Sequence, residues 1–189
     1  MNTDISKLYL QLGFEHILPL GLDHILFIIS LFLLNPKLKP VLLQATVFTL
    51  SHSISLGFAA AGLIKVSSSI IEPLIALSIV YVAIENIFVQ KVKPTRLILI
   101  FLFGLMHGLG FAGVLSSLGM PEGEFFTALL CFNLGVEGGQ ITVILIAWLL
   151  LGTWMSRQSW YHSYAVIPLS AIIALSALYW TIERIFFLS

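Results

Sequence analysis

Hydrophobic residues run through this chain in long, almost unbroken segments that short polar stretches separate. A helix needs about 20 predominantly apolar residues to cross the hydrocarbon core of a bilayer. Six segments meet that requirement: 16–34, 41–64, 71–90, 96–118, 124–151 and 164–187. The pattern therefore predicts an all-α, polytopic membrane bundle of about six transmembrane helices.

The polar breaks between these segments are short and contain residues that stop helices, as in 35–40 and 119–123. Connections of this length leave no room for a soluble domain, so we expect a single transmembrane domain over residues 1–189. Residues 3–14 predict an interfacial helix that leads into the first span. Pro19 predicts a kink where the two meet.

Composition supports a membrane protein and excludes several other classes. The chain is 59% hydrophobic and only 10% charged, with a formal net charge of zero, whereas soluble domains are about a quarter charged. No basic run indicates nucleic acid, so the expected partner is the lipid bilayer. The single cysteine, Cys131, excludes an internal disulfide and is expected to be a buried apolar side chain.

The basic residues are divided unequally between the two ends of the predicted bundle. One end carries Lys37, Lys39, Lys91, Lys93, Arg96 and Arg157, and the other carries Lys7, Lys65 and Arg184. Lys and Arg are enriched in cytoplasmic loops. We therefore expect a multi-pass protein of the inner (plasma) membrane with both termini on the non-cytoplasmic side.

Ionisable residues recur at one depth in the predicted spans. A rise of 1.5 Å per residue places Asp23, His24, His52 and His107 roughly 16 Å deep, near the middle of the core. Glu137 lies within about one turn of that level. Charged and titratable groups at membrane depth are costly, so their convergence predicts a functional site.

Imidazole and carboxylate donors without thiolate suit a divalent transition metal such as nickel, cobalt or zinc. The predicted ligands are Asp23, His24, His52 and His107. Glu137 is then a fifth ligand, a partner that orients an imidazole, or a general base. A metal-free network of hydrogen bonds, or a proton relay, is the alternative interpretation of the same residues.

Other polar residues are expected around the site or along a pathway to it. Asn133 and Gln140 share a helical stripe with Glu137, and Ser51 adjoins His52. Glu85 lies nearer the predicted cytoplasmic side, where it is a possible pathway residue. His16 falls a turn or more toward the outer surface, where it is either a pathway residue or an interfacial histidine.

Small residues flank one of the predicted ligands. Gly104 and Gly108 are four residues apart, a spacing that lets another helix backbone approach closely. We therefore expect a tight helix contact there that carries His107 into the bundle.

Four stretches of the sequence resemble the HupE/UreJ membrane protein family. They are GLDHILF at 21–27, FTLSHS at 48–53, FGLMHGLGFA at 103–112 and FNLGVEGGQ at 132–140. The family is associated with nickel or cobalt uptake for hydrogenase and urease maturation. The resemblance therefore implies metal permeation, and it carries over Asp23, His24 and His107.

Two departures place the chain closer to a divergent branch of that family. Family transporters have a histidine five residues before the Asp-His pair, whereas six residues separate His16 from Asp23 here. Phe103 stands at a family histidine position, and Gly110 stands at a family glutamate position.

The leading hypothesis is thus a nickel/cobalt-type metal-ion permease with a transient site at mid-membrane. The alternative is an intramembrane, zinc-type hydrolase in which histidines hold the metal and Glu137 activates its water. A structural membrane protein with a buried polar network is the third interpretation, and a homo-oligomer is compatible with all three.

Overall fold

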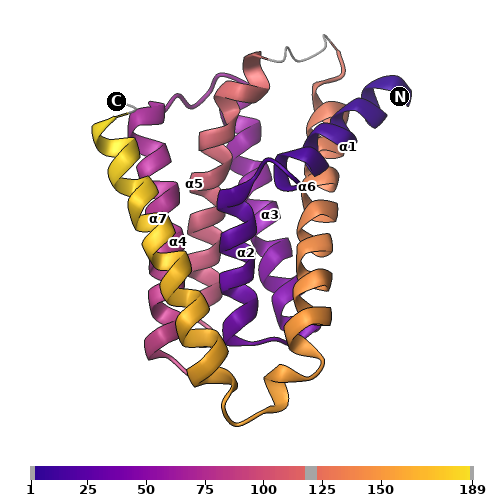
Figure 1. Ribbon diagram of the computed structural model, residues 1–189. Coiled ribbons are helices and arrows are strands. Elements are labelled where there is room, and N and C mark those ends of the chain that lie inside the picture. The colour runs from indigo at the N-terminus through magenta and orange to yellow at the C-terminus, as the bar shows by residue number, and fades with distance from the viewer. Residues whose placement is uncertain (1–2, 118–122, 188–189) are drawn as a thin grey trace.

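The chain forms an all-α bundle, as the sequence predicts. The computed structural model describes residues 3–117 and 123–187 (Figure 1). Its helices are α1 (Thr3–Ile17), α2 (Leu22–Leu34), α3 (Leu38–Ala60), α4 (Ser68–Phe88), α5 (Arg96–Ser117), α6 (Phe125–Ala147) and α7 (Ile167–Phe186). Within the described ranges no residue is in a strand. The helices lie side by side, with loops and termini at the two ends (Figure 1).

Four helical segments of the described chain are long and apolar enough to cross a membrane. They are Leu38–Ala60, Ser68–Phe88, Phe125–Gly152 and His162–Phe186. The count rises to five if α1 and α2, which bend by 66° at a break, form one span. The sequence predicts six spans. The additional one, predicted over 96–118, corresponds to α5, whose apolar part Arg96–Phe111 is shorter. The protein is a multi-pass membrane protein.

The first predicted span is split, and the break lies inside the bundle rather than at its end (Figure 1). The break spans the residues between Ile17 and Leu22, so it includes Pro19, where the sequence predicts a kink. Proline has no N–H to donate and clashes with the preceding turn, which ends α1. The expected lead-in helix is present as α1, and it packs along α6.

The tight contact expected at Gly104 and Gly108 is present between α5 and α3. A side chain at Gly104 would lie 2.6 Å from the Phe48 carbonyl oxygen, and one at Gly108 would overlap the His52 carbonyl. The two backbones can be this close only because neither position carries a Cβ. This contact fixes the register of His107 against His52.

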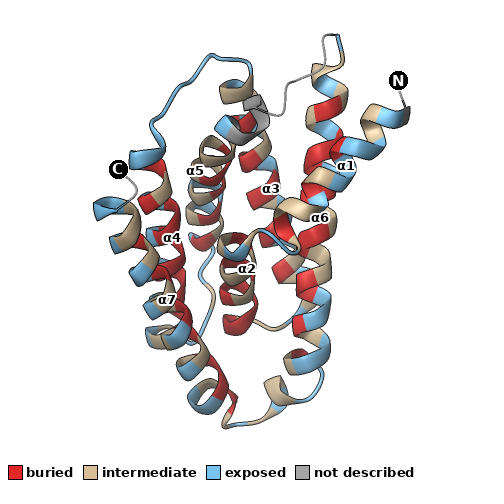
Figure 2. Cartoon of the chain, turned by 45° about the horizontal axis from the view of Figure 1, so that its top comes forward, coloured by how far each residue is buried: buried red, intermediate tan, exposed pale blue. Residues whose placement is uncertain are grey.

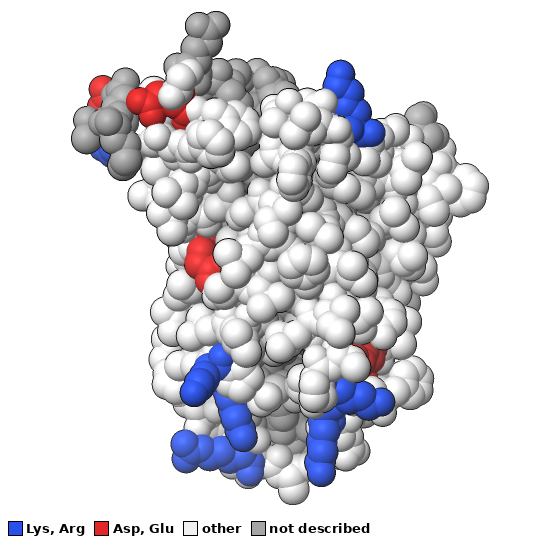
Figure 3. All heavy atoms as spheres, turned by 180° about the vertical axis from the view of Figure 1, so that it is seen from behind, with Lys and Arg blue, Asp and Glu red and all other residues white. Residues whose placement is uncertain are grey.

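Buried residues cover the inward faces of the helices, and exposed apolar residues cover the outer faces (Figure 2). Lys and Arg gather mainly at the end opposite the termini (Figure 3). Arg96, expected among them, is instead only 2% exposed and reaches Glu85 in an ion pair of 3.3 Å. A long side chain at a helix start can thus fold back into the bundle instead of snorkelling outward.

Candidate metal centre

The break between α1 and α2 brings two histidines together. His16 lies in the last turn of α1 and His24 in the first turn of α2, and their ring centroids are 4.6 Å apart. Gly21 allows this close turn, because a Cβ there would collide with the His16 carbonyl oxygen. The chain reversal therefore points both imidazoles into the same part of the bundle.

His52 of α3 completes a cluster of three histidines, which we call the histidine triad: His16, His24 and His52. Each offers one ring nitrogen, and these three nitrogens lie within 4.8 Å of one another. His24 and His52 are buried and His16 is partly buried. His107 of α5 lies beside the triad, with its ring centroid 5.0 Å from that of His24.

Hydrogen bonds orient the two histidines that come from continuous helices. The Asn133 Nδ2 donates to the Leu129 carbonyl at 2.8 Å, so its Oδ1 accepts from His52 Nδ1 at 3.3 Å. His107 Nδ1 donates to the Phe103 carbonyl at 2.8 Å. In both rings the proton is on Nδ1, which leaves the lone pair on Nε2. This is the arrangement that metal-binding histidines use.

The Nε2 atoms of all four rings lack hydrogen-bond partners among the described residues. The Nε2 atoms of His16, His24, His52 and His107 are each buried without a hydrogen bond in the described chain. A buried polar atom without a partner costs about 1–3 kcal/mol, and four in one place are unusual. A divalent metal ion is the ligand that this donor set fits, because it takes neutral imidazole nitrogens.

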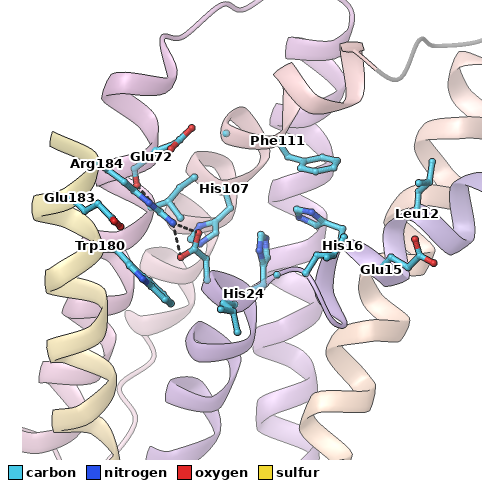
Figure 4. Close-up of a pocket in the computed structure, with 16 residues that line it drawn as sticks. Leu12, Glu15, His16, His24, Glu72, His107, Phe111, Trp180, Glu183 and Arg184 are labelled. Atoms are coloured by element: carbon cyan, nitrogen blue, oxygen red, sulfur yellow. Dashed lines mark hydrogen bonds and ion pairs between the residues drawn. The ribbon is translucent and has the colours of Figure 1, made fainter. Parts of the chain in front are cut away.

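A cavity of about 730 Å³ leads from the surface to three of these four rings (Figure 4). His16, His24 and His107 form part of its lining, whereas Leu20, 75% exposed, lies at its outer edge. The lining also includes four carboxylates, from Glu15, Asp23, Glu72 and Glu183. Two members of the triad, His16 and His24, therefore face the cavity together with His107.

Asp23, predicted as a ligand, is engaged by a residue far away in the sequence. Arg184 Nη2 lies 3.2 Å from Asp23 Oδ1 and 2.9 Å from Asp23 Oδ2. The sequence alone indicated Arg184 only as a basic residue near the end of the last helix. In the structure it reaches into the cavity and pairs with the carboxylate that adjoins His24 (Figure 4).

The remaining predicted residues lie along other contacts. Glu137 accepts a hydrogen bond of 2.6 Å from Thr46, and Gln140 accepts one of 3.0 Å from Thr49. Glu137 is not among the residues that line the cavity. Ser51 donates to the Phe48 carbonyl at 2.9 Å, in the contact between α3 and α5. Glu85 is paired with the buried arginine described above.

The sequence predicts His16 a turn or more away from the site, whereas in the structure it is one of the three residues of the triad. A continuous first span would have carried His16 away from His24 by about two turns. The signals for the reversal were Pro19 and Gly21, which together predict a break. The predicted kink was confirmed, but its consequence for His16 was missed.

Comparison with known proteins gives one family assignment. A family model described as HupE / UreJ protein matches residues 2–184. No curated protein and no solved structure gives a significant match to the chain.

Proposed function

The chain belongs to the HupE/UreJ family of membrane proteins, which is linked to nickel and cobalt transport, and on that premise we propose that it is a permease for a divalent transition-metal ion. In this proposal the histidine triad is the transient binding site at which the ion loses part of its water shell. His107 is the adjacent donor. The metal is the cargo of the protein and not a resident cofactor.

The observation that carries the proposal is the set of four buried, unpartnered Nε2 atoms. A hydrogen-bonded polar network, the metal-free alternative, would pair these nitrogens with one another or with neighbours. Instead the protons of His52 and His107 are committed to Asn133 and to a backbone carbonyl on the far side of each ring. The rings are thus held in the tautomer that accepts a metal.

The shape of the site favours transit over permanent storage. Nitrogens that bind one ion at about 2.1 Å are roughly 3.4 Å apart in a tetrahedral shell. The triad nitrogens are separated by up to 4.8 Å, so the rings must close on the ion. A loosely preformed site that is open to an acidic cavity can capture a hydrated cation and still release it.

Polar pairs between α3 and α6 provide the other half of the proposed path. Below His52 and Asn133, Thr49 bonds to Gln140 and Thr46 bonds to Glu137. From the level of His52 and Asn133, α3 leads back to Leu38 and α6 leads on to Ala147, at the end of the bundle opposite the termini (Figure 1). We assign Glu137 as the carboxylate of this half, where it receives the ion as it leaves the imidazoles.

The proposal is tested with the purified chain, both in detergent and in liposomes. Nickel binding is measured by calorimetry, and uptake is measured with a metal-sensitive dye inside the vesicles. Alanine at His24 or His52 should remove most of the binding and uptake, because an incomplete donor set leaves the ion hydrated. His162→Ala is the matched control, since His162 bonds to the Asn86 carbonyl away from the triad.

Glu137→Gln separates binding from transport. It keeps the shape and most of the hydrogen bonding but removes the charge, so nickel should still bind while uptake falls. Wild-type nickel binding in both the His24 and His52 variants would refute the metal site. Binding without uptake in the wild-type protein would refute the permease.

A further inference from the structure

Arg184 is placed unusually for a protein that takes up cations. Its guanidinium lies within the cavity that leads to the triad, and its side chain is 17% exposed. One nitrogen contacts both oxygens of Asp23, and the other donates to the Glu72 carbonyl at 3.2 Å. The guanidinium also lies 5.8 Å from the centroid of the Trp180 ring. A fixed positive charge beside a cation site repels the cation and weakens its binding, so the position of Arg184 needs an explanation.

The consequence of this contact is chemical. Asp23 directly precedes His24, so a free Asp23 carboxylate would add a hard oxygen donor next to the triad. Oxygen donors suit magnesium and calcium, whereas imidazoles suit nickel, cobalt and zinc. Because Arg184 contacts both carboxylate oxygens and neutralises their charge, the unpartnered buried donors among the cavity-lining residues are ring nitrogens.

We infer that Arg184 is a specificity-determining residue that masks Asp23 and thereby keeps the site selective for transition metals over magnesium and calcium. The inference rests on the proposed metal-binding function of the triad. Arginine suits the task because its planar fork can engage the carboxylate and the Glu72 carbonyl at once. An interaction between α7, α2 and α4 that served only for stability would have no effect on metal preference.

The experiment measures nickel binding to the purified chain while magnesium is raised. In the wild type, magnesium should displace little nickel. In Arg184→Gln the unmasked carboxylate should attract magnesium, so the magnesium concentration that halves nickel binding should fall by about tenfold or more. In the double variant Asp23→Asn, Arg184→Gln the oxygen charge is gone, and magnesium resistance should return.

The double variant distinguishes selectivity from stability. A purely structural role would leave both variants equally resistant to magnesium and would change only their melting temperatures. Equal magnesium sensitivity of the wild type and Arg184→Gln would therefore overturn the inference. A wild-type chain that binds no nickel would instead overturn the proposed function.

A second variant keeps the inference falsifiable if Arg184→Gln does not fold. Asp23→Asn alone retains the arginine and preserves the shape of the carboxylate. It should still bind nickel, because a masked carboxylate contributes no donor, although the uncompensated charge of Arg184 should weaken the affinity. Complete loss of nickel binding in Asp23→Asn would show that Asp23 ligates the metal and would overturn the masking role.

Discussion

Gly108→Ala is the sharpest test of how the bundle positions its histidines. The substitution adds one carbon at the contact between α5 and α3. That carbon would overlap the His52 carbonyl oxygen and the Ser55 hydroxyl, and it would lie 3.0 Å from the His52 carbonyl carbon. Because part of this obstacle is backbone, a change of rotamer cannot relieve the clash, and the two helices must separate.

Two opposing effects set the expected magnitude. Overpacking a close contact costs about 3 kcal/mol at the upper end of its usual range. Replacing glycine by alanine inside a helix returns up to about 1 kcal/mol. The net loss is about 2 kcal/mol, which corresponds to a fall in Tm of roughly 4–8 °C for a chain of this size.

The assay is thermal unfolding in detergent, followed by helical circular dichroism and by nickel titration at low temperature. Gly113→Ala on the same helix is the matched control, because a Cβ there meets nothing within 4 Å. The control should melt at or slightly above the wild-type temperature. Gly108→Ala should also bind nickel more weakly, since it separates His107 from His52. Indistinguishable melting of Gly108→Ala and Gly113→Ala would refute the close contact.

Three further predictions follow from single residues, and a fourth follows from the distribution of basic residues. Asn133→Leu should weaken nickel binding by about 10–100-fold in a titration, because it releases the histidine that Asn133 orients. Glu85→Gln should lower the unfolding free energy in denaturant titrations by about 3 kcal/mol, because it leaves its arginine partner buried without a counter-charge. Burial raises the pKa of Tyr161 to about 12. The stability that its neutral form contributes is therefore complete below about pH 10 and is lost as the pH rises through 12. Tyr161→Phe should flatten that alkaline fall in melting temperature. Reporter fusions at Pro94 and Gly123 should label opposite sides, with Pro94 cytoplasmic.

The fold class was predictable because membrane helices can be recognised from local sequence patterns. Each span needs a long apolar run, and the breaks carry residues that stop helices. The contact at Gly104 and Gly108 was also predictable, since small residues four apart are a local signal for close approach. The shared depth of His24, His52 and His107 followed from counting residues along straight helices.

What the sequence did not reveal depends on partners far apart in the chain. Asp23 and Arg184 are separated by 161 positions, and no local pattern indicates that they meet. His16 was misplaced because its position depends on the direction in which the chain turns after α1, and a proline predicts a break without predicting a direction. Arg96 was counted among the loop charges because helix-end arginines usually extend to the surface.

The two arginines that escaped prediction explain why the site is richer in nitrogen than the sequence suggests. The depth of an ionisable residue in the membrane does not distinguish a free carboxylate from a paired one, so the sequence predicts carboxylates and imidazoles alike as metal donors. In the fold, Arg184 pairs with Asp23 and Arg96 pairs with Glu85, so two of the expected carboxylates already carry a counter-charge. Glu137 bonds only to a neutral hydroxyl among its described contacts, which leaves its charge available to a cation. On the proposed function, an ion that has passed the acidic cavity meets imidazoles first and the unneutralised carboxylate of Glu137 later, and this order favours borderline-soft metals at the binding step.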